Sequence, residues 1–136
     1  MYNKTFDWYK LHILGCKLYD NGTEEDLRTA INRFYYGAFC HSRDYLISNK
    51  IFIDKKHKTE LYNPSSKVHS ITRFIFKNEK RKLNHKKGKK IHDYLYNLRE
   101  YRNEADYNSK VLSNLNFMAK RSKYCSEEIF NLIREL

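Results

Sequence analysis

Residues that interrupt helices are rare in this chain. Its 136 residues include one proline, Pro64, and four glycines. Proline removes a backbone hydrogen-bond donor and glycine weakens a helix, so few such residues allow long helices to run unbroken. Apolar residues recur at three- and four-residue spacing along most of the chain. We therefore predict an all-α fold, an antiparallel four-helix bundle with one additional short helix, as a single domain over residues 1–136.

The expected helices follow from turn and cap signals. Asp20-Asn21-Gly22 has turn chemistry, and Thr23 is a good N-cap for the helix that follows it. Ser65 or Ser66 is expected to cap the short helix, with Val68, Ile71, Phe74 and Ile75 on its inner face. We expect residues 51–66 to form a loop and residues 77–90 a basic connection. The long helices are then expected at about 4–19, 23–49, 89–106 and 111–134.

Cysteine usage and hydropathy exclude several classes of protein. The three cysteines are isolated, which argues against a disulfide framework or a zinc site and predicts a reducing compartment. No apolar run approaches the roughly 18 residues of a membrane span. Residues 1–10 contain Lys4, Asp7 and Lys10 and do not resemble a signal peptide. We therefore predict a cytoplasmic location, no membrane partner, no metal and no cofactor.

Polar and aromatic side chains gather near the end of the fourth expected helix. Arg102 and Asp106 are four residues apart and share a face, Arg99 lies one turn earlier, and Asn103 and Tyr107 are adjacent. A guanidinium binds phosphate through two parallel hydrogen bonds and keeps its charge. We assign the phosphate-holding or catalytic role to Arg102, with Asn103 and Asp106 orienting it and Tyr107 supporting it. The alternative is an exposed ion pair that stabilises by only a few tenths of a kcal/mol.

A basic segment precedes that helix in a chain of net charge +11. Clustered cations attract a phosphate backbone without reading its sequence. The alternative is a solvated loop, with Gly88 suited to mobility. The nucleic-acid-binding residues that we predict are Lys80, Arg81, Lys82, Lys86, Lys87, Lys89, Lys90, Arg33 and Arg99.

Gly37 occupies an unusual position in the middle of the second expected helix. Arg33, Tyr36 and Cys40 share its face, opposite the apolar stripe. Glycine costs about 1 kcal/mol relative to alanine inside a helix. We interpret it as a point of close approach for another backbone, from the fourth expected helix or from a second subunit. Ordinary packing within the chain is the alternative.

Four sequence elements follow one another along the chain. They are Arg33-Phe34-Tyr35-Tyr36-Gly37-Ala38-Phe39, Arg43, Val68-His69-Ser70 and Arg102-x-x-Ala105-Asp106-Tyr107. Together they resemble the HEPN domain family over about residues 23–134. The closest branch is that of small stand-alone proteins with an Arg-x-x-x-Asp-Tyr element.

The resemblance implies a helical bundle that forms a homodimer with Arg102 near the subunit cleft. Many members cut RNA without a metal, using the ribose 2′-hydroxyl as nucleophile and an Arg-x(4–6)-His motif. In this chain the motif's histidine is absent, because Asp106, Tyr107 and Asn108 follow Arg102 at those spacings. A tyrosine with a pKa near 10 is a poor base. Another proton acceptor is therefore needed, and His41 and His69 are the candidates.

These observations predict an RNA-engaging protein and leave its enzyme class open. One reading is a metal-independent endoribonuclease of a toxin–antitoxin or defence system, a setting that comes from the resemblance alone. The alternative is a non-catalytic module that binds RNA or a nucleotide, or recruits a partner such as a nucleotidyltransferase. A third reading is a structural subunit, in which protein covers the surface around Arg102.

Overall fold

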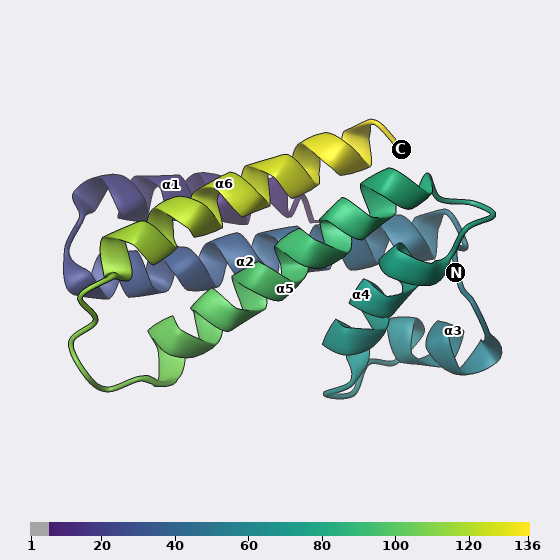
Figure 1. Ribbon diagram of the computed structural model, residues 1–136, viewed down its shortest axis with the longest axis horizontal. Helices are drawn as coiled ribbons and strands as arrows, with labels where there is room; N and C mark the ends of the chain where they lie inside the picture. Colours follow the sequence, from purple (N-terminus) through teal and green to yellow (C-terminus); the bar gives the residue numbers. More distant parts are fainter. Residues whose placement is uncertain (1–5) are drawn as a thin grey trace.

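The computed structural model describes residues 6–136, and this part of the chain is entirely helical, without a strand (Figure 1). The all-α class predicted from the sequence is confirmed. The described residues form six helices, which are α1 (Tyr9–Asn21), α2 (Glu24–Ser48), α3 (Lys55–Tyr62), α4 (Val68–Asn78), α5 (His85–Tyr107) and α6 (Leu115–Arg134).

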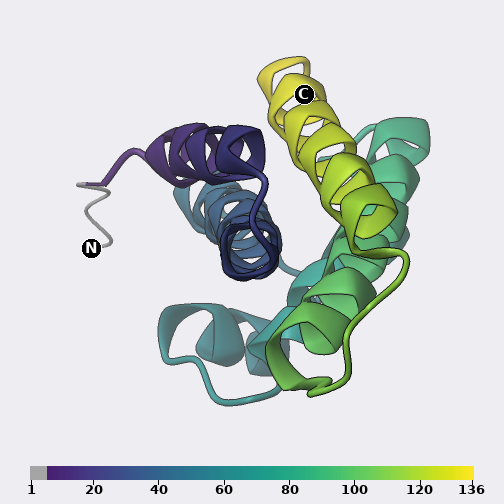
Figure 2. The same cartoon turned by 90° about the vertical axis from the view of Figure 1, so that its left-hand side faces the viewer.

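Helix α2 lies at the centre of the packing. It contacts α1, α5 and α6, and α5 also packs against α6 and α4. Successive long helices run in opposite directions, so the start of α2 lies near the end of α5 (Figure 1). The short helices α3 and α4 pack on each other beside the C-terminal half of α2 (Figure 1), and α3 lies below α2 in the view of Figure 2. The fold is thus a compact helical bundle with a two-helix extension.

The core is apolar and continuous through most of the bundle. Phe34 of α2, Ile75 of α4, Leu98 of α5 and Ile129 of α6 are fully buried. Burial of one such side chain contributes about 1.5–3 kcal/mol. Leu61 is the one buried residue of α3 and ties that short helix to the same core. None of the helices within residues 6–136 is long and apolar enough to cross a membrane.

The predicted turn after the first helix and the predicted cap of the second helix are confirmed. Gly22 ends α1 in the left-handed region with φ of 74°, and Thr23 Oγ1 accepts a hydrogen bond from the backbone N–H of Asp26. Helix α1 begins at Tyr9, and our expected start near Lys4 lies outside the described residues.

Two expectations about the middle of the chain are wrong. Residues 51–66 are not a loop, because Asp54 caps α3 by accepting from the backbone N–H of His57. Residues 77–90 are not a long basic connection, since α4 continues to Asn78 and α5 begins at His85. Asn84 caps α5 by accepting from the N–H of Lys87. Only residues 79–84 join the two helices.

Helix α4 also differs in detail from the expectation. Its N-terminal cap residue is Lys67 and makes no side-chain cap bond, although Ser65 Oγ accepts from the Lys67 N–H. Phe74, expected on the inner face, is exposed, and its ring contacts that of His57 on α3. The inner face instead includes Thr72 and Phe76.

Two glycines mark close approaches between helices. A Cβ at Gly37 would lie 3.2 Å from the Trp8 carbonyl oxygen and 3.1 Å from Leu11 Cβ. The close neighbour is therefore the start of α1 with the residue before it, which is packing within the chain, whereas we had proposed the fourth expected helix or a second subunit. A Cβ at Gly88 would lie 2.2 Å from the Phe76 carbonyl oxygen. Gly88 is thus a packing residue in α5 and does not belong to a mobile loop.

Candidate anion-binding site between α2, α4 and α5

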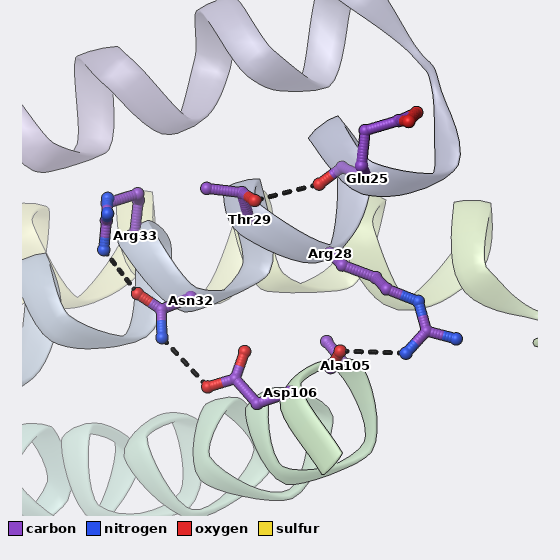
Figure 3. Close-up of a pocket in the computed structure, with 7 residues that line it drawn as sticks. All are labelled: Glu25, Arg28, Thr29, Asn32, Arg33, Ala105 and Asp106. Carbon is purple, nitrogen blue, oxygen red and sulfur yellow. Dashed lines mark hydrogen bonds between the residues drawn. The ribbon is translucent and has the colours of Figure 1, made fainter. Parts of the chain in front are cut away.

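The end of α5 is fixed to the start of α2 by one arginine. The guanidinium of Arg28 donates to the carbonyls of Ala105 (3.0 Å), Asn108 (2.6 Å) and Lys110 (2.7 Å). Figure 3 shows its bond to Ala105. The last carbonyls of a helix have no partner within the helix. Arg28 supplies that partner and so holds the turn that carries Asp106.

Arg102 lies just before this turn, surrounded by polar side chains. Its Nη2 donates to the hydroxyl oxygens of Tyr36 (2.9 Å) and Tyr107 (3.4 Å), and its Nη1 donates to Asn103 Oδ1 (3.1 Å). Its Nε lies 3.0 Å from Asp106 Oδ2, and the Arg102 side chain is only 17% exposed. The guanidinium is therefore oriented from several sides and does not point into open solvent.

Tyrosine rings flank the same guanidinium. Its central carbon lies 5.2 Å from the ring centroid of Tyr36, 5.3 Å from that of Tyr107 and 6.0 Å from that of Tyr35. Such cation–π contacts stabilise by about 0.5–2 kcal/mol and fix the position of the charge. Tyr107 itself is 72% exposed, so its ring remains available to another molecule.

A pocket of about 410 Å³ opens beside Asp106, between α2 and α5 (Figure 3). Asn32 Nδ2 donates to Asp106 Oδ2 at 2.9 Å, and Arg33 Nη1 donates to Asn32 Oδ1 at 2.7 Å. A chain of hydrogen bonds and one ion pair thus connects Arg33 to Arg102 through Asn32 and Asp106. The pocket wall formed by α2 carries the cationic side chains of Arg28 and Arg33 and the acidic side chain of Glu25.

His69 of α4 reaches the same region. Its Nδ1 is hydrogen-bonded to the Tyr35 hydroxyl at 2.5 Å, and its ring stacks on Phe39 with centroids 4.2 Å apart. Its ring also lies edge-on to that of Tyr36, which Arg102 contacts from another side. Burial, followed by the positive charges of Arg102, Arg99 and Arg73, lowers the pKa of His69 to about 4. His69 is therefore neutral at pH 7.

Burial and positive charge also shift the pKa values of the neighbouring Tyr35 and Arg73. Burial raises the pKa of the Tyr35 phenol, and nearby Arg73, Arg99 and Arg102 oppose that rise. Burial lowers the pKa of the Arg73 guanidinium, and Arg99 lowers it further. Tyr35 thus stays a neutral phenol, and three guanidinium groups face this part of the bundle.

The structure brings some of the predicted site residues together. Arg102, Asn103, Asp106 and Tyr107 form one contacting group, as their spacing predicts. Arg99 lies close enough to affect His69, and Arg33 joins through Asn32.

The predicted lysines lie elsewhere on the molecule. Lys89 precedes Arg102 by thirteen residues, which places it about 20 Å away along α5. Lys80 and Arg81 line a different pocket, Lys82 donates to the Lys50 carbonyl, and Lys87 pairs with Glu135. The basic segment and the Arg102 group therefore occupy opposite ends of α5.

The two histidines proposed as proton acceptors have separate locations. His41 lies on the side of α2 that meets α6, with its ring 4.6 Å from that of Phe130. Only His69 is placed beside the Arg102 group. Within residues 6–136, no group of three or more histidine, cysteine or acidic side chains is arranged to hold a metal ion.

Sequence reasoning left Asn32, Tyr36 and Arg73 out of the predicted site, although it named His69 as a possible proton acceptor. Asn32 and Tyr36 are four residues apart on α2, a spacing that places both on one face. His69 and Arg73 show the same spacing on α4. That repeated spacing of polar residues was the available signal, but it does not reveal which helix faces which.

Comparison with known proteins identifies no relative: no family model, no curated protein and no solved structure matches this chain. The function must therefore be inferred from the site itself.

Proposed function

We propose that this chain engages RNA and that Arg102 holds a phosphate of the strand. The observation that carries the proposal is the position of the Arg102 guanidinium, which contacts Tyr36 and Tyr107 and pairs with Asp106, a residue that lines an open pocket. A fixed guanidinium can offer its planar edge to phosphate oxygens. Tyrosine rings beside it can stack on bases, which every single-stranded nucleic acid exposes.

The charge of the whole chain supports a polyanionic ligand. The net charge is +11, and cations occupy even the first turn of α5, where no acidic residue is present. Cations at a helix N-terminus oppose the helix dipole, each by about 0.3–1 kcal/mol. A bound phosphate backbone would relieve that repulsion, so we assign Lys86, Lys87, Lys89 and Lys90 to a second, sequence-independent contact with the strand.

The sharper form of the proposal is metal-independent cleavage with His69 as proton acceptor. In the tautomer with its proton on Nδ1, His69 donates to the Tyr35 oxygen and leaves Nε2 free. Nε2 then takes the proton of the ribose 2′-hydroxyl, the 2′-oxygen bonds to phosphorus, and the bond to the 5′-oxygen breaks. The 5′-oxygen leaves with a proton from water. Arg102 stabilises the charge that develops on the phosphate.

One observation favours the alternative of a non-catalytic module. Asp106 forms an ion pair with Arg102, and the Tyr35 hydroxyl occupies His69 Nδ1. The Arg102 guanidinium and the His69 ring therefore already have partners within the chain. A module that holds RNA, a nucleotide or a partner such as a nucleotidyltransferase needs only the orientation of these groups. The homodimer and the defence or toxin–antitoxin setting belong to the same proposal and rest on the resemblance alone.

Arg102→Gln tests the proposal directly. Purified protein is mixed with labelled structured and single-stranded RNA, with and without EDTA, and binding and cleavage are measured. We expect Arg102→Gln to weaken binding at least tenfold, because one charge-assisted phosphate contact contributes about 1.5–3 kcal/mol. Arg134→Gln, at the end of α6, is the matched control. Absence of RNA binding at low salt, or equal binding by the two variants, would refute the proposal.

The pH dependence of any cleavage separates catalysis by His69 from other routes. Because the pKa of His69 is lowered to about 4, the neutral base is present from about pH 5 upward. Cleavage should rise between about pH 3 and 5 and then level off, and His69→Gln should abolish it while leaving binding intact. A rise centred near pH 6.5, the ordinary histidine value, would exclude this role for His69.

A further inference from the structure

A row of cationic and aromatic side chains continues from Arg102 along α5 and across to α4. Tyr96, Arg99 and Arg102 are spaced three residues apart and lie on one side of α5. The guanidinium of Arg73 on α4 lies 5.9 Å from the centroid of the Tyr96 ring. The row from Tyr96 to Tyr107 spans about 16 Å of helix. At the 3.4 Å spacing of a stacked strand, that length accommodates a few nucleotides.

The guanidiniums of Arg73 and Arg99 differ from that of Arg102 in having no carboxylate partner. The six ion pairs found within residues 6–136 include neither of them. Arg73 Nη1 is buried and has no hydrogen-bond partner in the same part of the chain. Glu100 lies near enough to act on Arg73, but it does not pair with it. Two positive charges thus lie close enough to act on each other, and neither is in a direct ion pair within residues 6–136.

An exposed ring accompanies these charges. Tyr96 is 48% exposed, and its hydroxyl lies 3.5 Å from Glu100 Oε1. A pocket of about 400 Å³ borders the same ring and is lined by His92, Asp93 and Asn97. A duplex hides the faces of its bases, whereas a single strand presents them for stacking. An exposed tyrosine beside the Arg73 guanidinium, and one helical turn before Arg99, suits a single strand better than a duplex.

We propose that Arg73, Arg99 and Tyr96 form a second subsite, which takes the nucleotide unit next to the one held at Arg102. Arg73 and Arg99 contact its phosphate, Tyr96 stacks on its base, and the ligand is single-stranded RNA. This subsite rests on the proposed function and deepens it, because it sets the path of the strand across α4 and α5. The basic segment at the far end of α5 is not required for this contact.

The chain offers a matched control on the opposite side of α5. Arg121 lies 5.1 Å from the ring centroid of Tyr124, and that ring contacts Tyr94. Tyr94 and Tyr96 are two residues apart and therefore point to different sides of α5. The pair of Arg121 and Tyr124, both on α6, thus has the same chemistry as the pair of Arg73 and Tyr96 but faces the side of α5 that carries Tyr94.

The test measures affinity by fluorescence anisotropy, using a labelled single strand of ~10 nucleotides and the same strand annealed to its complement. Tyr96→Ala should weaken binding of the single strand about tenfold and leave duplex binding nearly unchanged. Arg73→Gln and Arg99→Gln should each reduce the slope of log affinity against log salt by about 0.7. Arg121→Gln and Tyr124→Ala should change neither quantity. Thermal unfolding of each variant shows whether it is folded.

Tyr96→Leu and Arg73→Lys guard against loss of folding. Tyr96→Leu keeps the apolar bulk but has no aromatic face, so its affinity for the single strand should be as low as that of Tyr96→Ala. Arg73→Lys keeps the charge, so it should retain most of the salt slope. If the single strand binds through Arg102 but the Arg73 and Tyr96 variants match their controls, the second subsite is refuted and the proposed function survives. If Tyr96→Ala weakens duplex binding as much as single-strand binding, the second subsite is also refuted. If no RNA binds, both proposals fail.

Discussion

Two histidines in this bundle make similar contacts and have opposite electrostatic surroundings. His12 of α1 is 3% exposed, its Nδ1 is hydrogen-bonded to Ser126 Oγ at 2.8 Å, and its ring stacks on Tyr9. His69 of α4 is bonded to a hydroxyl and stacked on an aromatic ring in the same manner. The second nitrogen of His12 lies 2.7 Å from Glu127 Oε2. His69 instead faces three arginines.

The difference distinguishes a packing histidine from a candidate for chemistry. Burial lowers the pKa of His12, and Glu127 opposes that change. Neutral His12 accepts from the Ser126 hydroxyl and donates to Glu127, so both of its nitrogens are used within the protein. At His69 burial and the surrounding cations act in the same direction. A polar group with all its partners inside the chain stabilises the fold, whereas the positive charge around His69 is what the anionic ligand that we propose would neutralise.

The largest expected effect of a substitution in this comparison is at His12. His12→Ala removes a buried ring and leaves Ser126 without its partner, so we expect a loss of about 2–4 kcal/mol in the free energy of unfolding. Urea denaturation measures it. RNA affinity measured where the variant is folded should match the wild type. A loss below about 1 kcal/mol would mean that His12 is not a packing residue.

The next largest effect is the contribution of His69 to the pH dependence of the free energy of unfolding. Its pKa is about 6.5 in the unfolded chain and about 4 in the folded protein. Between these values the unfolded state binds more protons, so stability is complete above pH 6.5 and falls as the pH drops towards 4. Partial exposure reduces the contribution, which we place at about 1–2 kcal/mol.

His69→Gln should flatten this dependence, because glutamine does not titrate. Urea denaturation of the variant and the wild type at several pH values between 4 and 7 provides the measurement. His85→Gln, at an exposed position at the start of α5, is the control and should leave the slope unchanged. Identical slopes for His69→Gln and the wild type would contradict the assigned surroundings of His69.

The smallest effect is expected at Glu127. Its side chain is 42% exposed, so Glu127→Gln should cost less than about 1 kcal/mol of stability. Because the carboxylate raises the pKa of His12, its neutralisation should lower that pKa further. Titration of the His12 ring by NMR tests the direction. An upward shift would show that Glu127 is not the electrostatic partner of His12.

The sequence predicts the parts of this molecule that depend on local patterns. Thr23 caps α2 where its apolar stripe begins, so the start of that helix is predictable. The group from Arg102 to Tyr107 lies within two helical turns, and its contacts follow from residue spacing. Helix α3 is not predictable in this way, because its eight residues include three lysines and one buried side chain, Leu61.

The approach of α4 to the site could not be derived from sequence patterns. His69 lies more than thirty residues before Arg102, and its position depends on how α4 folds back along α5. Gly88 permits that packing, because a side chain there would strike the Phe76 carbonyl. The composition of residues 77–90, which contain Gly88, alone suggests a flexible segment. Long-range packing therefore determined the part of the candidate site that the sequence left open.

The bonds from Arg28 to the end of α5 have a consequence for ligand affinity. Helix ends commonly fray, and a frayed end must become ordered before it can bind. Here three carbonyls beyond Arg102 are held by a residue of another helix, so the ordering occurs during folding. A ligand at Tyr107 therefore meets an arrangement already in place and loses less entropy on binding. Arg28, which also lines the neighbouring pocket, can thus influence how tightly the protein holds a ligand at Tyr107 by fixing the end of α5.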